Sequence, residues 1–185
     1  MLYIIRHGQT DWNTQYRIQG SEDIALNETG RQMAIEAGKK YRSVHIDLCY
    51  TSPLRRAYET ARLMLRGRAI PIIADDRLRE MNFGGYEGCE HVYEHPEWNI
   101  YNFFKHPETY VADRDAESID HLMERTGDFL ESVIRPALAE GKDILIVGHG
   151  AMNASIINRV LGIPRERYWE KGQKNCEMME LPVSW

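Results

Sequence analysis

Leu2-Tyr3-Ile4-Ile5-Arg6-His7-Gly8 stands at the start of the chain and decides the fold that we expect. Its apolar half is typical of a buried strand, so an arginine and a histidine are predicted where that strand ends. A second apolar stretch, residues 143–148, is followed by His149 and another glycine. Because ligands bind at the carboxyl ends of strands in open α/β sheets, the two histidines are predicted to share one composite site. Gly8 has no side chain, which is expected to let a ligand approach the backbone closely.

Strand and helix signals alternate along the chain, which predicts an α/β protein with a mostly parallel central sheet. Further strands are expected at 46–50 and 70–74, and an edge strand is expected within 176–181. Residues 11–26 are expected to form a loop. The helices are expected after the N-cap Asn27, from Ser52-Pro53 to Gly67, over 117–139, and over 151–161 up to Gly162.

Two helix features are predicted from particular residues. Ser52 suits the N-cap and Pro53 the first helical position, where a missing N–H removes no intrahelical hydrogen bond. Pro136 lies late in the amphipathic segment 117–139, so a kink or an early end is expected near Arg135.

Residues 86–118 are the least regular part of a chain that is otherwise predicted to be one domain, 1–185. The segment is rich in rings: Tyr93, Trp98, Tyr101, Phe103, Phe104 and Tyr110, with His91, His95 and His106. One interpretation is a short helical insertion that packs aromatic side chains over the edge of the sheet. The other is a lid that shapes a substrate pocket, and the two are compatible.

Composition is that of a soluble globular protein, with 43% hydrophobic and 28% charged residues in a chain of 185. No apolar run approaches the roughly 20 residues of a membrane helix, and no basic segment of a signal peptide precedes Arg6. The three cysteines, Cys49, Cys89 and Cys176, are odd in number and widely spaced. They argue against a disulfide framework or a zinc cluster, and a cytoplasmic location is expected.

The charge balance points to a local rather than a global attraction for anions. The net charge is −5, from 23 basic and 28 acidic side chains, which argues against nucleic-acid binding. The seven histidines form no His-Glu-x-x-His motif, so neither a metal nor a cofactor is expected. No membrane partner is expected, and a homodimer through the aromatic insertion or the tail strand stays open.

Four segments, in this order along the chain, resemble the motifs of the histidine phosphatase superfamily. They are Arg6-His7-Gly8-Gln9-Thr10-Asp11-Trp12-Asn13, Ser52-Pro53-Leu54-Arg55-Arg56-Ala57-Tyr58-Glu59-Thr60-Ala61, Leu78-Arg79-Glu80-Met81-Asn82-Phe83-Gly84 and Gly148-His149-Gly150. The resemblance covers residues 1–85 and about 143–162, whereas the middle of the chain is generic. It implies the phosphoglycerate mutase-like fold, a three-layer α/β/α sandwich, and an enzyme that acts on phosphoryl groups.

The resemblance makes His7 the nucleophile and Arg6 and Arg56 the phosphate clamps. Neutral imidazole can attack phosphorus and form a phosphohistidine, and neighbouring arginines favour the neutral form by lowering the histidine pKa. The planar fork of arginine matches the oxygens of a phosphate group.

The remaining site residues are also implied by the resemblance. His149 is expected to donate a hydrogen bond to the phosphoryl group, and Glu80 to protonate the leaving group. Asn13 and Gln19 match positions that line the phosphate pocket. Two charged residues near these motifs are not assigned to the site: Arg55 is interpreted as a solvated helix residue, and Glu87 as a structural residue.

A phosphatase that acts on a small phosphorylated metabolite is favoured over a mutase. Family members that are cofactor-dependent phosphoglycerate mutases are longer and carry extra basic residues, including a paired arginine, in the middle insertion. Here residues 90–120 contain only Lys105 and Arg114 as permanent cations. A cofactor-dependent phosphoglycerate mutase is the first alternative, and a non-catalytic protein that binds phosphorylated ligands is the second. The aromatic residues suggest a ring-bearing or apolar substrate, and the sequence does not choose among phosphomonoesters.

Overall fold

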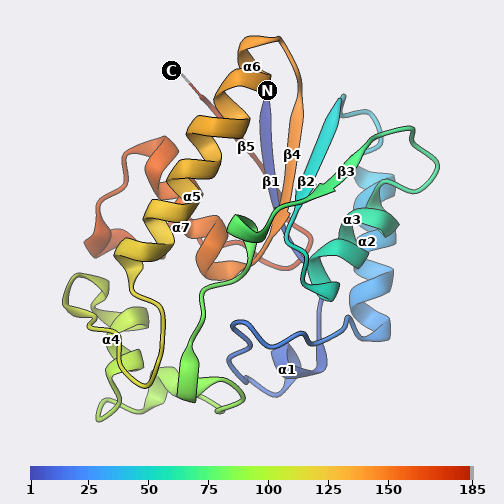
Figure 1. Ribbon diagram of the computed structural model, residues 1–185. Helices are drawn as coiled ribbons and strands as arrows, with labels where there is room; N and C mark the ends of the chain where they lie inside the picture. The colour runs from blue at the N-terminus through green and yellow to red at the C-terminus, as the bar shows by residue number, and fades with distance from the viewer. Residues whose placement is uncertain (184–185) are drawn as a thin grey trace.

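A computed structural model describes residues 1–183, which form a central sheet between two layers of helices (Figure 1). The sheet has the order β3-β2-β4-β1-β5. The strands are β1 Leu2–Arg6, β2 Leu48–Thr51, β3 Ile72–Ala74, β4 Ile144–Gly148 and β5 Met178–Leu181. All neighbouring strands are parallel except β1 and β5, which are antiparallel. The predicted α/β class, the mostly parallel sheet and the edge strand near the end of the chain are confirmed.

Strands β1 and β4 lie side by side and bring together two segments that are far apart in the sequence. Their register pairs Leu2 with Ile144 and Arg6 with Gly148, so His7 and His149 follow at the same edge. The backbone N–H of His7 continues the ladder by donating to the carbonyl of Gly148 at 3.0 Å. Every residue of β4 is buried, as expected for a parallel strand that is covered by helices on both faces.

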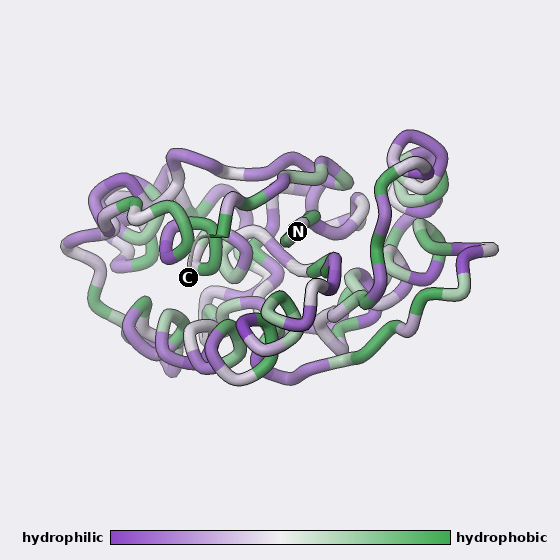
Figure 2. Tube along the Cα trace, turned by 90° about the horizontal axis from the view of Figure 1, so that it is seen from above, coloured by the Kyte–Doolittle hydropathy of each residue, from purple (hydrophilic) through white to green (hydrophobic). Residues whose placement is uncertain are grey.

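Helices α2 Glu28–Lys40 and α3 Arg55–Met64 cover one face of the sheet, and α5 Ile119–Phe129, α6 Arg135–Ala139 and α7 Gly150–Leu161 cover the other. Helices α1 Asp11–Thr14 and α4 Asn99–Lys105 lie beyond the carboxyl edge of the sheet (Figure 1). Ile5 of β1 packs in the half of the core that α2 and α3 cover, and Ile4 packs in the half that α5 and α7 cover. Seen from above, the N-terminus lies near the centre of the view, as expected for an inner first strand (Figure 2).

The expected start of helix α3 is wrong by two residues. Ser52 still belongs to the sheet edge, because its N–H donates to the carbonyl of Val147 at 3.2 Å. The Ser52 hydroxyl then accepts from the N–H of Leu54, and helical residues begin only at Arg55. Strands β2 and β3 likewise begin two residues later than expected.

The segment 11–26 is not entirely a loop, because it begins with the short helix α1. Thr10 and Asn13 form a capping box there, in which each side chain accepts from the other's backbone N–H. Two other helix ends are confirmed. Asn27 caps α2 through Gly30 N–H, and Gly162 ends α7 in the left-handed conformation.

The segment expected as one long helix, 117–139, is interrupted where Pro136 approaches. Helix α5 starts at Ile119 after the cap Ser118, and a π-helical segment, Leu130–Ile134, joins it to α6. Proline has no N–H to donate, and its ring collides with the carbonyl of the preceding turn. The wider π turn accommodates both effects, and the interruption lies next to the expected Arg135.

The insertion 86–118 combines short 3₁₀ turns with helix α4 and lies beyond the carboxyl edge of the sheet (Figure 1). Phe103 and Tyr110 are buried in it, and Phe103 packs on Tyr168 and Trp169 from the tail. The expected packing of aromatic side chains at this edge is therefore confirmed. None of the helices described over residues 1–183 is long and apolar enough to span a membrane.

Candidate active site

His7 lies directly after β1 and keeps one ring nitrogen free. It is 2% exposed, and its Nδ1 lies 2.6 Å from the carbonyl oxygen of Gly8. A carbonyl only accepts, so Nδ1 carries the proton and donates it, and Nε2 is left with an unshared electron pair. Gly8 itself is required for packing rather than for approach of a ligand. A Cβ atom there would lie 2.4 Å from the carbonyl oxygen of Gly30 at the start of α2.

His149 stands at the N-cap of α7, and its ring centroid is 5.2 Å from that of His7. Its side chain is fully buried, yet neither ring nitrogen has a hydrogen-bond partner among the described residues. The backbone is held by Asn153, whose Oδ1 accepts from His149 N–H at 3.1 Å. The ring therefore retains the capacity to donate to a ligand.

Both histidines are held in the neutral form. Burial lowers the pKa of His7 well below its usual range, and the charges of Arg56 and Arg6 lower it further, against the effect of the Gly8 hydrogen bond. Burial also lowers the pKa of His149 well below its usual range, again with help from the charge of Arg56. A neutral imidazole is the form that can attack an electrophile.

Two guanidinium groups flank the histidines, that of Arg56 buried and that of Arg6 half-buried. Arg56, on the first turn of α3, is fully buried and donates to the carbonyls of Glu22 and Gly20 at 2.6 and 2.7 Å. Burial lowers its pKa to about 10, so the group stays charged near neutral pH. Arg6 donates to the carbonyl of Gln173 at 3.2 Å. The Nε atoms of both arginines are buried without a partner among the described residues.

Glu80 is fixed by the start of helix α7. Its Oε1 accepts from the N–H groups of Met81 and Met152, each at 2.9 Å, and its Oε2 accepts from Ala151 N–H at 3.1 Å. A carboxyl group has about four lone-pair positions, so one position on Oε2 remains for a proton. The side chain lines the same cavity as His7.

The cavity at this edge has a volume of about 280 Å³. All but one of the sequence-predicted site residues line it: Arg6, His7, Asn13, Gln19, Arg56 and Glu80. The exception is His149, which does not line the cavity and whose ring packs beside that of His7. Asn13 Oδ1 accepts from the backbone and hydroxyl of Thr10, and the side-chain Oε1 of Gln19 is buried without a partner among the described residues.

The cavity lining contains neither Arg55, which is expected to be a solvated helix residue, nor Glu87, which is expected to be structural. Arg55 binds Asp23 through its side chain and its backbone N–H. Glu87 accepts from the N–H groups of Ser21 and Phe83. Both contacts fix the loop whose carbonyls receive Arg56, so these side chains support the pocket from outside.

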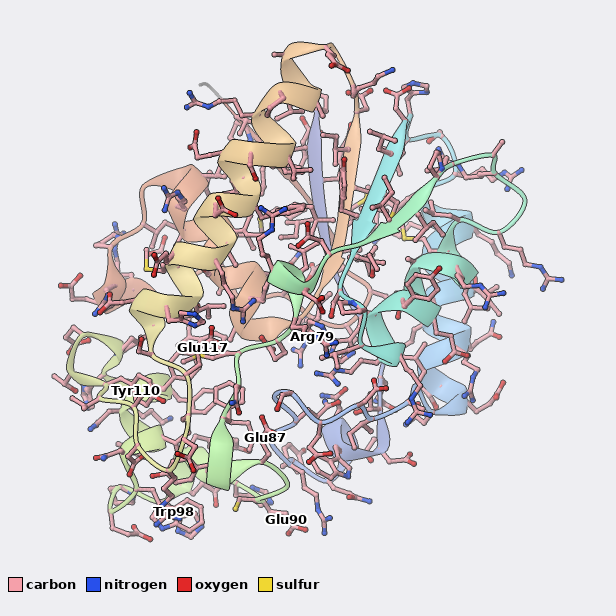
Figure 3. The ribbon with its side chains drawn as sticks, in the orientation of Figure 1. Arg79, Glu87, Glu90, Trp98, Tyr110 and Glu117 are labelled. Atoms are coloured by element: carbon pink, nitrogen blue, oxygen red, sulfur yellow. The ribbon has the colours of Figure 1, made fainter. Side chains whose placement is uncertain are left out.

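An arginine that no sequence pattern identified supports Glu80 from α5. Arg125 donates to the carbonyls of Arg77, Arg79 and Glu80 at 2.6, 2.8 and 3.3 Å, and pairs with Glu117 at 2.7 Å. Glu117 in turn accepts from the N–H of Asn82, on the other side of Glu80. Figure 3 labels Glu117, just before helix α5, and Arg79, just before Glu80.

The tail also contributes to the site without any recognisable motif. Gln173 donates to the carbonyl of Ile4 and accepts from Asn153, and Asn175 donates to the carbonyl of His7 at 2.7 Å. Isolated amide side chains in a polar segment give no sequence signal, and only the fold reveals their contacts.

A separate group with metal-ligand spacing is formed by His45, Asp47 and Asp143, at the amino ends of β2 and β4. Asp47 accepts from the backbone of Asp143 at 2.7 Å, and Asp143 pairs with the N-terminal amino group. These contacts tie strand ends together on the side of the sheet opposite the cavity.

Two buried histidines and two arginines, Arg56 buried and Arg6 half-buried, meet at the carboxyl edge of a mostly parallel sheet, an arrangement that suits phosphoryl chemistry. The chain belongs to the histidine phosphatase superfamily (branch 1), whose family model matches residues 2–184. It is a phosphohydrolase of the phosphoglycerate mutase-like type, and the recognition made from the four sequence motifs is confirmed.

Known proteins similar to this chain include both phosphatases and mutases. The uncharacterized phosphatase PhoE of Bacillus subtilis is 33% identical over 162 residues, which are 86% of this chain and 76% of that protein. A 2,3-bisphosphoglycerate-dependent phosphoglycerate mutase of Cytophaga hutchinsonii is 32% identical over 153 residues, 81% and 72% of the two chains. The solved structure of a mycobacterial glucosyl-3-phosphoglycerate phosphatase matches with a TM-score of 0.84 at 27% identity. The match covers 96% of this chain and 90% of the chain of that phosphatase.

Proposed function

We propose that this protein hydrolyses a small phosphomonoester without a metal ion, through a phosphohistidine formed on His7. The observation that carries the proposal is a group of buried nitrogen atoms without a partner among the described residues. They belong to Arg6 and Arg56, which line the cavity, and to His149, whose ring packs beside that of His7. An unsatisfied buried polar group costs about 1–3 kcal/mol, so the site is arranged for a ligand that supplies several acceptors. A phosphoryl group supplies three oxygens and the negative charge that two arginines require.

In the first step the Nε2 electron pair of His7 attacks phosphorus as the bond from phosphorus to the alcohol oxygen breaks. The leaving oxygen takes the proton of the Glu80 carboxyl group, which lines the cavity beside it. Positive charge develops on the imidazole ring, and the Nδ1–H donated to Gly8 stabilises it. Arg6, Arg56 and His149 hold the oxygens of the group in transfer.

In the second step a water molecule replaces the alcohol. The Glu80 carboxylate takes a proton from this water as its oxygen attacks phosphorus, and the bond from phosphorus to Nε2 breaks. Inorganic phosphate leaves, His7 returns to the neutral imidazole, and Glu80 is again protonated for the next cycle.

Hydrolysis fits the cavity better than mutase activity. A mutase must hold a carboxylate as well as a phosphate and must protect its phosphoenzyme from water. The two cations of the insertion lie outside the cavity lining. Arg114 stacks on Tyr86 with its guanidinium 4.7 Å from the ring centroid, and the ammonium of Lys105 lies 5.9 Å from the Tyr93 centroid. Neither supplies a second acid-binding group.

The proposal is tested by phosphate release from a panel of phosphomonoesters in EDTA, with His7→Ala beside the wild type. The panel includes 3-phosphoglycerate with and without 2,3-bisphosphoglycerate. We expect metal-free release that His7→Ala abolishes while the fold, followed by circular dichroism, is retained. Conversion of 3- to 2-phosphoglycerate without release would make the protein a mutase. Retained release in His7→Ala would refute the mechanism.

Two arginines of helix α3 provide a variant and its control for the phosphate clamp. Arg56→Met should raise KM and lower kcat, because a buried partner of the phosphoryl oxygens is lost. Arg62→Met removes the same charge from an exposed position of this helix, outside the cavity lining. Equal losses in both variants would show that net charge, rather than the buried fork of Arg56, holds the phosphate.

A further inference from the structure

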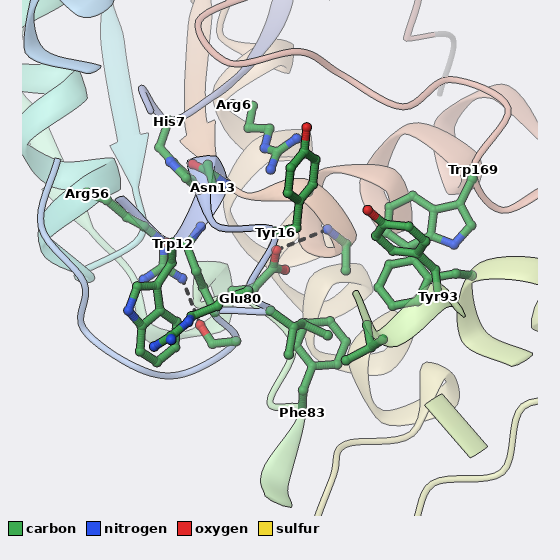
Figure 4. A pocket seen from close by; sticks show the side chains of 18 residues that line it. Arg6, His7, Trp12, Asn13, Tyr16, Arg56, Glu80, Phe83, Tyr93 and Trp169 are labelled. Carbon is green, nitrogen blue, oxygen red and sulfur yellow. Dashed lines mark hydrogen bonds between the residues drawn. The ribbon is translucent and has the colours of Figure 1, made fainter. Parts of the chain in front are cut away.

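Aromatic side chains line much of the cavity that His7 and Glu80 share, and they suggest what the leaving group is. We call Tyr16, Phe83, Tyr93, Phe104 and Trp169 the aromatic wall; all five line the cavity. In Figure 4 Tyr93 and Trp169 lie at the opposite end of the view from His7 and Arg56, with Glu80 between them. An alcohol that leaves past Glu80 therefore extends toward the wall.

The wall is fixed in position before any substrate arrives. Phe104 and Trp169 are stacked with centroids 5.4 Å apart and planes 15° apart, and Tyr93 meets Phe104 edge-on at 6.5 Å. The indole N–H of Trp169 donates to the carbonyl of Phe103 at 2.8 Å, which fixes the ring. A fixed apolar surface binds a ring without the entropy loss of ordering its own side chains.

Tyr16 belongs to the wall and is 60% exposed, which is unusual for so large a ring. Its backbone has a φ of +55°, in the left-handed region that non-glycine residues seldom adopt. The conformation is held by a hydrogen bond from His91 N–H to the Tyr16 carbonyl at 3.0 Å and by stacking of the two rings at 4.9 Å. The fold thus keeps an aromatic face in solvent beside the site.

The charges at this end of the cavity are already neutralised. Arg17 lines the cavity, but its guanidinium pairs with Glu90 at 2.9 Å. Lys105 and Arg114 lie outside the lining, as described above. A second phosphate or a carboxylate on the leaving group would lose water at this end without gaining a free cation.

We infer that the leaving group is a neutral alcohol that bears an aromatic or heteroaromatic ring, which packs on the aromatic wall. The inference rests on the proposed function for the position of the phosphoryl group. It excludes leaving groups that carry a second acidic group, such as glycerate. It also makes the wall, rather than the phosphate clamp, the part of the site that selects the substrate.

The test measures binding without turnover, so that it does not depend on catalysis. Calorimetry compares 3-phenylpropylphosphonate with butylphosphonate, two non-hydrolysable probes that share the phosphonate and differ in the ring. We expect the ring-bearing probe to bind at least about tenfold more tightly than butylphosphonate, and also more tightly than 4-phosphonobutanoate, a non-hydrolysable probe that carries a carboxylate. Equal affinity of the phenyl and butyl probes, absence of binding by both, or tighter binding of 4-phosphonobutanoate would overturn the inference.

Two tyrosines of the insertion provide the variant and its control. Tyr93→Ala should reduce the affinity ratio of the two phosphonates about fivefold to tenfold, and Tyr93→Leu should restore part of it. Tyr101→Ala removes an equal side chain that does not line the cavity, and the ratio should stay as in the wild type. A ratio unchanged by Tyr93→Ala would overturn the role of the wall. Ring preference without hydrolysis of any ester would refute the proposed function alone, and hydrolysis without ring preference would refute this inference alone.

Discussion

His7 is buried and still keeps a free ring nitrogen, and both properties follow from its immediate neighbours. The Gly8 carbonyl accepts from Nδ1, and the two arginines favour a neutral ring. The position of Glu80 is also fixed, because three backbone N–H groups donate to its carboxyl group beside the cavity. We expect each of these residues to leave a distinct experimental signature.

Glu80→Gln should slow hydrolysis in proportion to how much the leaving group needs a proton. We expect a loss of about 10²–10⁴-fold in kcat for an alkyl phosphate, the usual contribution of a general acid. For 4-nitrophenyl phosphate, whose alcohol leaves without a proton, the first step should change only a few-fold. Rapid-quench measurement of that step with both substrates checks this, and equal losses would remove the proton-donor role.

The two neutral histidines should make the free energy of unfolding depend on pH. Their pKa values are lowered in the folded protein, so the unfolded chain binds more protons below about pH 6.5, the ordinary histidine value. Stability is therefore full above about pH 6.5 and falls as the pH drops, by up to about 1.4 kcal/mol per pH unit for each histidine.

Urea unfolding between about pH 6.5 and 5.5 measures this slope. His7→Asn should reduce the slope by about one proton, while His106→Asn, which changes an exposed histidine, should leave it as in the wild type. A slope that is the same in all three proteins would contradict the neutral, buried state of His7.

Individual residues of the site were predictable from sequence to different degrees. Arg6, His7 and His149 follow apolar strands, so their position at one edge could be inferred from the chain itself. Glu80 could not, since it is one of 28 acidic residues and only the resemblance to the family selected it. Arg125 was missed because its role depends on three carbonyls that only the folded chain brings together.

Helix α5 acts on the site through the loop that precedes Glu80, and Arg125 is the connection. Its side chain and that of Glu117 are only 15% and 8% exposed. Arg125→Met leaves Glu117 with fewer partners and should destabilise the fold by about 3–5 kcal/mol, the usual effect of breaking a buried ion pair. It should also reduce kcat about tenfold more for alkyl than for aryl phosphates, because Glu80 loses its support.

Arg79→Met is the matched control for this prediction. Arg79 directly precedes Glu80, but its side chain pairs with the exposed Asp76. Loss of this side chain should therefore change the free energy of unfolding by no more than about 0.5 kcal/mol. Chemical denaturation and the ratio of alkyl to aryl turnover check both variants. An Arg125→Met protein with the wild-type ratio would limit Arg125 to a purely structural role.

Elements were predicted best where apolar periodicity was strong and worst where hydrogen bonding decided their ends. Strands β1 and β4 and helix α7 follow directly from their apolar patterns. The start of α3 was misplaced because Ser52 completes the sheet before it turns, a choice that depends on Val147 far along the chain. Helix α1 was missed because a capping box, rather than an apolar stripe, defines its four residues.

Across the whole molecule, parallel pairing of β1 with β4 brings motifs from the two ends of the chain to one cavity. The protein carries a net charge of −5, so in the proposed mechanism the buried Arg56 and the half-buried Arg6, rather than the overall field, attract the phosphate. The insertion, generic in sequence, supplies rings to the opposite end of the same cavity. Its contribution could not be predicted in detail, because which rings face the cavity and which fill the core depends on packing.

The central claim is that His7 carries the phosphoryl group, and trapping that intermediate tests it most directly. With 4-nitrophenyl phosphate the leaving group needs no proton, so the phosphoenzyme should form quickly and accumulate. Rapid quenching in alkali, followed by peptide mass analysis, should find one phosphoryl group on the peptide that contains His7, with a burst of nitrophenolate of the same size. A phosphoryl group on any other side chain, or steady release with neither a burst nor a labelled peptide, would contradict the claim.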